Sequence, residues 1–465
     1  MAIILPANTL SAGGFSVANS CRFNDGDSPQ LHRSQPGTPT STKIFTWSGW
    51  FKLGSSTSQI TLASSFTSGS IYDQIKIMSL ATHNQVLRIE AGSNEGNAID
   101  LKASLSLRDP SAWYHLVLAV DTSQGVAANR DKVYINGTQI TSWQTETHST
   151  QNDTWHMNAS GKTIKVGVYD NGTPQDFFDG YLAEVVQVDG QQLTPTSFGE
   201  YDEDSPTIWK PINVSTLTFG NNGYYMDFED SSALGNDVAG KGDFTVANLA
   251  AADQATDTPT NNFCTINPLN KTDLTFSQGN CKLVCSTTSS AHRMYKATFG
   301  LTTGKWFWEL KPVHVGSSFG NVGIIDDVGY DEDDYLGNET YGYSYRPDGK
   351  KYNAGSGTTY GDTWTDDDVI GVALNMDDNE LKFYKNGTVQ NSGTAISIST
   401  TPTTYVPAGS MIKDSTNPDY EYNFGGCSAF TVSSGNSDAN GYGNFEYAVP
   451  SGFFALCTKN LAEYG

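Results

Sequence analysis

Short runs in which apolar and polar residues alternate recur along this chain, and they constrain its fold more than any other feature. Residues 45–53 (FTWSGWFKL), 113–120 (WYHLVLAV) and 181–188 (YLAEVVQV) are examples. A period of two places successive side chains on opposite faces of an extended strand, so each run can bury one face. The chain shows no amphipathic helical pattern longer than two turns. The pattern therefore predicts an all-β protein of short antiparallel strands.

Two hairpins can be recognised directly from the sequence. Asn-Gly pairs divide the alternating runs 132–140 (KVYINGTQI) and 381–388 (LKFYKNGT). Both residues tolerate the positive φ angles of a type I′ turn, which joins two antiparallel strands. The second hairpin repeats the logic of the first in the other half of the chain. With 465 residues, we expect tandem antiparallel β-sandwiches.

Changes in composition suggest where the parts of the chain begin and end. Residues 201–206 (YDEDSP) open an acidic stretch that ends in Ala- and Thr-rich sequence near residue 260. We therefore expect a closing strand and linker between two sandwiches. The expected segments are an N-terminal docking segment (1–14), a first sandwich (15–200), a closing strand and linker (201–262) and a second sandwich (263–465).

The charge of the chain argues against two classes of partner. The formal net charge is −23, which repels nucleic acids and anionic lipids at long range. No run approaches the roughly 20 apolar residues that span a membrane, so we expect no nucleic-acid partner and no membrane insertion. The first residues lack the basic leader of a secretion signal, which predicts folding in a cytoplasm. Six scattered cysteines are expected to be reduced thiols.

The first sandwich resembles the laminin-G-like, concanavalin A-like family. Three stretches carry the resemblance: residues 16–27 with their NDGD turn, residues 113–137 around the hairpin, and 177–186 (FFDGYLAEVV). Ala183 stands where that pattern has an Asp. The resemblance implies a jelly-roll sandwich.

The second sandwich resembles SPRY domains. Residues 304–309 (GKWFWE), 321–325 (NVGII), 341–345 (YGYSY), 368–374 (DVIGVAL) and 383–387 (FYKNG) follow the order of that family. Five ordered matches over such a length are specific as a set, although each alone would be weak.

The pairing of these two modules behind residues 5–15 (LPANTLSAGGF) resembles structural proteins of marine and cyanobacterial tailed bacteriophages. The resemblance implies a protein of the virion surface, made in the host cytoplasm, of the tail fibre or spike type. Its implied partners are host cell-surface polysaccharide and other virion proteins, and its implied state is a homotrimer. The alternative is a capsid decoration or head-fibre protein with a mainly structural role. A secreted cellular lectin is disfavoured because no signal peptide is visible.

No catalytic set is apparent in the sequence. Glucanases of this architecture carry two carboxylates on one strand face, whereas in residues 184–189 (EVVQVD) the two acids have the wrong spacing. Residues 316–320 (GSSFG) match a serine-hydrolase elbow, but that elbow needs a following helix. We therefore expect a protein that is not an enzyme.

Aromatic residues in loops are the candidate ligand-binding groups, because loops on a rigid sandwich often carry binding sites. Each of them could instead belong to a core or a subunit interface. The candidates are Trp143, Trp155, His156 and Tyr169 in the first sandwich, and Tyr330, Tyr335, Tyr345 and Trp364 in the second.

Turn-borne aspartates are the candidate ligands for calcium (Ca2+), which takes six to eight oxygen ligands from loops. Asp is also a common turn residue for its own hydrogen-bonding reasons, so both interpretations stay open. The candidates are Asp25, Asp27, Asp170, Asp176 and Asp179.

Overall fold

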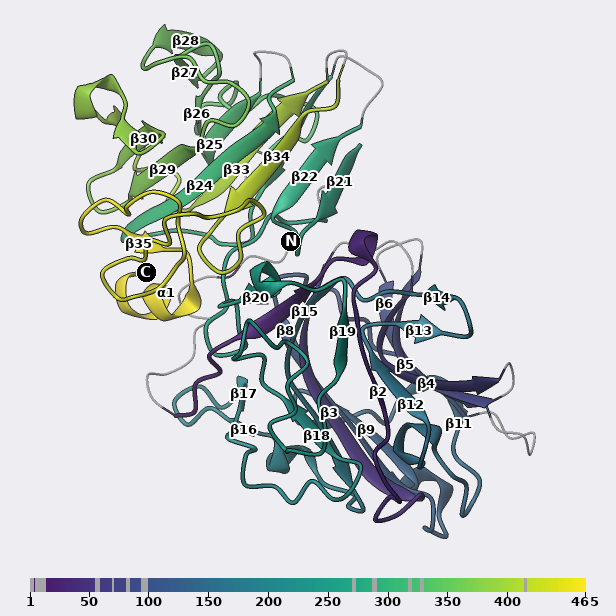
Figure 1. Ribbon diagram of the computed structural model, residues 1–465. Helices are drawn as coiled ribbons and strands as arrows, with labels where there is room; N and C mark the ends of the chain where they lie inside the picture. The colour runs from purple at the N-terminus through teal and green to yellow at the C-terminus, as the bar shows by residue number, and fades with distance from the viewer. Residues whose placement is uncertain are drawn as a thin grey trace. The chain divides into compact units, whose positions relative to one another are not determined.

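The computed structural model shows an almost entirely antiparallel β-protein in two compact units (Figure 1). The first unit comprises residues 11–260, and the second comprises residues 1–10 with 261–465. The all-β class and the two sandwiches predicted from the sequence are confirmed. The structure describes residues 4, 14–54, 59–68, 71–80, 84–92, 99–269, 273–286, 291–316, 320–326, 330–413 and 416–465.

Two eight-stranded sheets form the first unit. We call the sheet with the Asn-Gly hairpin the hairpin sheet, and the other the opposing sheet. In order, the hairpin sheet contains β10 (Thr138–Gln139), β9 (Asp131–Ile135), β8 (Trp113–Asp121), β3 (Ile44–Leu53), β15 (Gly180–Asp189), β1 (Ser20–Phe23) and β20 (Gln254–Ala255), with β18 (Tyr224–Met226) on β15. The opposing sheet contains β11 (Trp143–Thr147), β7 (Ile99–Ala103), β6 (Asn84–Gly92), β5 (Ile71–Leu80), β4 (Ile60–Ser68), β12 (Thr163–Val166), β2 (Gln30–Ser34) and β19 (Thr245–Ala247).

Smaller elements complete the first unit. Two two-stranded ribbons are β13 (Tyr169–Asp170) with β14 (Pro174–Gln175), and β16 (Gly199–Tyr201) with β17 (Trp209–Pro211). Short 3-10 turns are η2 (Asp25–Asp27), η3 (Ala127–Asn129), η4 (His156–Asn158), η5 (Pro195–Ser197) and η6 (Ala251–Asp253).

The second unit also has a hairpin sheet and an opposing sheet. Its hairpin sheet runs β31 (Thr388–Val389), β30 (Glu380–Lys385), β29 (Ile370–Asn375), β24 (Lys305–His314), β34 (Asp419–Asn423), β22 (Lys282–Cys285) and β21 (Leu274–Ser277), with β32 (Ile396–Ser397) on β30 and β35 (Phe454–Ala455) parallel to β24. The opposing sheet runs β28 (Ser356–Thr359), β27 (Lys350–Asn353), β26 (Gly342–Tyr345), β25 (Asn321–Asp326), β33 (Tyr405–Ile412) and β23 (His292–Lys296). The turn η7 (Asn391–Gly393) and the helix α1 (Thr458–Tyr464) complete it.

The two units share one strand order. In the hairpin sheets, β10-β9-β8-β3-β15-β1 corresponds to β31-β30-β29-β24-β34-β22. In the opposing sheets, β7-β6-β5-β4-β12-β2 corresponds to β28-β27-β26-β25-β33-β23. Corresponding strands also follow each other in the same order along the chain, so both units are sandwiches of one topology.

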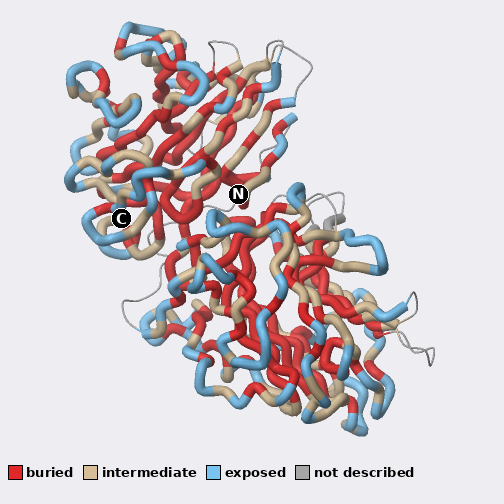
Figure 2. Tube along the Cα trace, viewed as in Figure 1, coloured by how far each residue is buried: buried red, intermediate tan, exposed pale blue. Residues whose placement is uncertain are grey.

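Strand β3 shows how alternation builds the core of the first unit. Phe45, Trp47 and Phe51 lie in the main core between the sheets and are fully buried. The other side of β3 is also buried, including Ser48 and Lys52 (Figure 2). Alternation alone would leave that side in water, so a further segment must cover it.

The covering segment lies within residues 201–262, which were expected to form a closing strand and linker. Strand β18 pairs with β15, and β20 pairs with β1. Above the hairpin sheet, this part of the chain packs a second apolar cluster that joins Val186 to Phe219 and Tyr225. Residues up to 260 therefore form a third layer of the first unit, and the second unit begins at residue 261.

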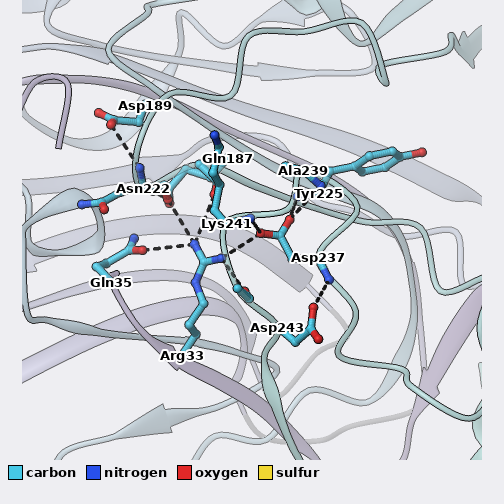
Figure 3. A network of polar contacts seen from close by, with 12 residues as sticks. Arg33, Gln35, Gln187, Asp189, Asn222, Tyr225, Asp237, Ala239, Lys241 and Asp243 are labelled. Carbon is cyan, nitrogen blue, oxygen red and sulfur yellow. Dashed lines mark hydrogen bonds and ion pairs between the residues drawn. The ribbon is translucent and has the colours of Figure 1, made fainter. Parts of the chain in front are cut away.

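A buried polar network also fixes this segment to the sandwich (Figure 3). Arg33 on β2 donates to Asp237 at 3.0 Å and to the carbonyl oxygen of Asn222 at 3.2 Å. The side chains of Arg33 and Asp237 are 5% and 0% exposed. Asp237 also accepts the backbone N–H of Tyr225 at 2.9 Å. Because every group has a partner, the network can hold the layer without leaving a buried charge alone.

The expected N-terminal docking segment (1–14) lies outside the described residues except for two positions. One of these, Ile4, forms a parallel bridge to Phe299, and its carbonyl oxygen accepts the N–H of Gly300 at 3.0 Å. Among the described residues, no helix has the length and apolarity needed to cross a membrane.

Both Asn-Gly hairpins are present, and the Asn has the same contacts in each unit. Asn136 and Asn386 have φ angles of 47° and 46°. The N–H of Asn136 donates to the carbonyl oxygen of His115, and its side-chain oxygen accepts the N–H of the same residue at 2.8 Å. Asn386 makes the same two bonds with Val369, at 2.8 Å each. The Asn thus ties the turn to the start of the adjacent strand.

We expect Asn136→Ala and Asn386→Ala each to destabilise their unit by about 1–3 kcal/mol. Each change leaves a backbone N–H without its side-chain acceptor and puts a Cβ-bearing residue at positive φ. The Asn→Gly variants relieve the second effect and should lose less. Urea denaturation of the full chain measures all four. Equal losses for Ala and Gly at both sites would contradict the role of positive φ.

Candidate functional site: an aromatic and charged face of the first unit

The outward face of the opposing sheet in the first unit is the candidate binding face. Alternation along β5 directs Ile75 and Ile77 into the core. Tyr72, Gln74 and Lys76 therefore lie on the other side of the sheet. The third layer covers the hairpin sheet, so this face is the one that the sandwich presents to ligands.

The register of β5, β6 and β7 sets like charges side by side on this face. Lys76 is opposite Arg88, and Glu90 is opposite Asp100. Opposite charges then meet diagonally: Lys76 pairs with Glu90, and Arg88 pairs with Glu90 at 2.7 Å. Arg88 also binds both carboxylate oxygens of Asp100 at 2.8 Å, and this bond raises the pKa of Arg88. The two rows lock each other into a rigid array of donors and acceptors.

Three aromatic rings lie together beside this array. Tyr169 on β13 meets Phe66 on β4 edge to face, with ring centroids 6.2 Å apart, and Tyr72 on β5 at 5.8 Å. All three side chains are partly exposed. Burial raises the pKa of Tyr169 to about 12, so its hydroxyl is a neutral donor at physiological pH.

The β13–β14 ribbon carries Tyr169 over the sheet and is anchored at both ends. Asp170 forms an ion pair with Lys165 on β12. Asp176 accepts a hydrogen bond from Gln59 at 2.7 Å, and burial raises the pKa of Asp176. The ribbon thus fixes one aromatic ring above a strand-borne polar surface, an arrangement suited to hold a ligand with both apolar and hydroxylated sides.

Of the four aromatic candidates in the first unit, Tyr169 alone belongs to this face. The prediction is wrong for Trp155, which is 1% exposed, packs on Phe45 and donates to Ser149 at 3.1 Å. The polar loop around Trp155 hides a turn that inserts into the end of the core. Trp143 is half-buried against the same core. His156 lies 3.4 Å from Asp73, with 16% of its side chain exposed.

In the second unit the prediction is wrong for Tyr345 and Trp364. Both are core residues, 0% and 1% exposed, with ring centroids 6.2 Å apart. Tyr330 is partly buried, since its hydroxyl donates to the carbonyl oxygen of Met294 at 2.7 Å. Tyr335 remains accessible beside His292, with ring centroids 5.2 Å apart.

The calcium candidates do not gather into a shared site. Among the described residues, no three His, Cys, Asp or Glu side chains are placed to hold a metal ion. Asp170 and Asp176 have the partners given above, and Asp27 accepts from Asn24 at 2.7 Å. Asp179 is buried on β15's approach, where its carbonyl oxygen accepts the N–H of Gly54. Asp25 begins the 3-10 turn η2. These carboxylates serve turns and side-chain pairs.

A buried Ser–His pair, which sequence reasoning missed, has the wrong tautomer for catalysis. Ser48 Oγ lies 2.8 Å from His115 Nε2, and Trp209 Nε1 donates to His115 Nδ1 at 2.9 Å. An indole N–H can only donate, so Nδ1 is unprotonated and Nε2 carries the hydrogen toward Ser48. Burial lowers the pKa of His115 to about 3. His115 therefore cannot take a proton from Ser48, and the pair is structural.

Comparison with protein families matches each unit to a known domain. Residues 25–196 match the concanavalin A-like lectin/glucanases superfamily, and residues 305–425 match the SPRY domain. The two domain types predicted from the sequence are confirmed. The search leaves open a role on a virion.

Individual relatives are more distant. The chain is 28% identical over 151 residues to the probable ATP-dependent RNA helicase ddx1 of Dictyostelium discoideum, covering 31% of this chain and 17% of that protein. A human SPRY domain is similar with 19% identity and a TM-score of 0.27, covering 32% of this chain and 94% of that one. The SPRY domain of human HERC1 has 18% identity and a TM-score of 0.30, covering 36% and 99%. Together, the two domain types suggest carbohydrate or protein binding.

Proposed function

From a chain that pairs a concanavalin A-like domain with a SPRY domain, we propose a non-catalytic binding protein whose first unit holds carbohydrate. The binding site is the outward face of the opposing sheet, around Tyr169. The observation that carries the proposal is the partly exposed ring group of Phe66, Tyr72 and Tyr169 beside the fixed charges of Arg88. Rings can stack on the apolar face of a sugar, while the charged row binds its hydroxyl groups.

The absence of catalysis is part of the proposal. The carboxylates of Glu90 and Asp100 are both engaged by Arg88. A glycosidase needs one carboxyl free to donate a proton and a second placed as base or nucleophile. Incubation of the full chain with a bound oligosaccharide should therefore release no shorter products. Cleavage that Asp176→Asn or Glu90→Gln abolishes would contradict the proposal.

We expect Tyr169→Ala and Tyr72→Ala each to weaken oligosaccharide binding by about 1–3 kcal/mol, roughly 5- to 150-fold. Both side chains are partly exposed, so the unit should still fold. A glycan array identifies the ligand, and isothermal titration measures the affinities. Tyr201→Ala is the matched control, because Tyr201 is 45% exposed and lies on the β16–β17 ribbon. If no glycan binds, or if Tyr169→Ala binds like the parent, the proposal is wrong.

We further propose that the polysaccharide belongs to a host cell surface and that the protein is part of a bacteriophage virion. Support comes from the sequence resemblance carried by the two modules and residues 5–15. Antibody labelling of phage particles tests this separately from sugar binding. Label at the tail supports receptor recognition, label on the head supports the decoration role, and unlabelled particles contradict the virion proposal.

A further inference from the structure

A small recess opens on the outward side of the hairpin sheet in the second unit, where β24, β29 and β30 lie side by side (Figure 1). Three aromatic rings line it, from Phe307, Tyr384 and Tyr447, and Glu309 contributes a carboxylate. Its volume is about 190 Å³ including the open mouth. The enclosed part, about 10 Å³, has room for about one water molecule.

Alternation and two glycines create this recess. Along β24, Trp306, Trp308 and Leu310 enter the core, so Phe307 and Glu309 lie on the outward side. Gly371 is opposite Glu309 in the register, and a Cβ there would lie 2.9 Å from the Phe307 ring.

Gly387 of the Asn-Gly hairpin forms another part of the lining. Its φ is +76°, and a Cβ at this position would lie 2.6 Å from the Tyr447 ring. Side chains at Gly371 or Gly387 would therefore displace the rings that form the walls.

The charge of the recess comes from Glu309, whose residue is 0% exposed. Its carboxylate accepts the backbone N–H groups of Glu446 and Tyr447 at 2.9 Å each, and the Asn423 side chain at 3.1 Å. Both oxygens act as acceptors, as in the ionised form, and the three donors are neutral. Burial nevertheless raises the pKa of Glu309 to about 7. A cation entering the recess would stabilise this buried negative charge.

We propose that this recess binds the primary ammonium group of a lysine side chain on a protein partner. Aromatic rings attract a cation over their faces, and a buried carboxylate strengthens the attraction. An ammonium group is about the size of one water, and the lysine stem is a slender chain of four carbons. A guanidinium is wider than the enclosed space, and an amino sugar carries its nitrogen directly on a bulky ring. The formal net charge of −23 favours the approach of basic segments.

Ligand-observed NMR on the full chain tests this site with n-butylammonium as the probe and n-butanol as its neutral counterpart. We expect weak, saturable binding of the ammonium and none of the alcohol. Ala448→Trp fills the recess from an exposed lining position and should weaken binding about tenfold or more. Val313→Trp adds the same ring at a 42% exposed position of β24 outside the lining and is the matched control.

Competition then identifies the source of the ammonium. A short lysine peptide should displace n-butylammonium, whereas the same peptide with arginine or acetyl-lysine, and free glucosamine, should not. Binding that Ala448→Trp leaves unchanged would overturn the site. Displacement by glucosamine as strong as that by the lysine peptide would overturn the assignment to a protein partner. No binding of n-butylammonium at all would overturn the proposal.

Discussion

Replacing Asp257 by Ala is expected to destabilise the first unit by about 3–5 kcal/mol. Asp257 Oδ2 lies 2.7 Å from Lys52 Nζ, and both side chains are 1% exposed. Its other oxygen accepts from Trp113 Nε1 at 3.0 Å. Removing the carboxylate leaves a buried ammonium without its counter-charge and a buried indole N–H without its acceptor. Few single substitutions in this unit should have a larger effect.

Urea denaturation of the full chain measures this loss, with two comparisons. Glu200→Ala removes an exposed carboxylate 3.7 Å from Lys210 and should change stability by less than about 0.5 kcal/mol. The double variant Lys52→Met with Asp257→Leu replaces the pair by apolar groups and should recover most of the loss. If Asp257→Ala costs no more than Glu200→Ala, the segment around residue 257 is not fixed to the sandwich as described.

Replacing Glu184 by Gln is expected to stabilise the first unit at alkaline pH and to have little effect at pH 4. Glu184 sits in β15 with a φ of 49°, where the register shifts between Ala183 and Val186. Burial raises the pKa of Glu184 from 4.5 to about 8, and Tyr225 donates to its carboxylate at 2.8 Å. Gln keeps that hydrogen bond and cannot ionise.

The direction follows from the two states. Because the folded pKa of Glu184 lies above the unfolded value, the parent keeps its full stability below pH 4.5 and loses it as pH rises through about 8. The gain from Glu184→Gln should therefore grow over this range to about 3–5 kcal/mol.

His115 titrates in the opposite sense, because burial lowers its pKa to about 3 and its contribution is lost as pH falls below 6.5. The difference between parent and Glu184→Gln at each pH, from urea denaturation at pH 4, 6 and 8.5, cancels that background. A difference independent of pH would show that Glu184 does not ionise within this range.

Much of the fold could be predicted because it is written locally. Each Asn-Gly hairpin needs neighbouring residues alone, and alternation identifies strands such as β3 and β8 without knowledge of their partners. The third layer could not be predicted in this way. Residues 201–262 contain few strong strand signals, and their role depends on covering a sheet that is formed by distant parts of the chain.

The candidate site was found in part. Tyr169 was identified from its loop, whereas Trp155 was misplaced because a polar stretch can still insert one ring into a core. Alternation along β6 puts Arg88 and Glu90 on one face, and this signal was available in the sequence. Their alignment with Asp100 depends on the register between strands, which local patterns leave undetermined.

Hydrogen exchange of the full chain, with and without a saturating oligosaccharide from the glycan array, tests the central claim most directly. The account predicts slower exchange in β5, β6 and the β13–β14 ribbon, and the same pattern should vanish in Tyr169→Ala. Protection confined to the second unit, or to loops distant from Tyr169, would contradict carbohydrate binding on this face.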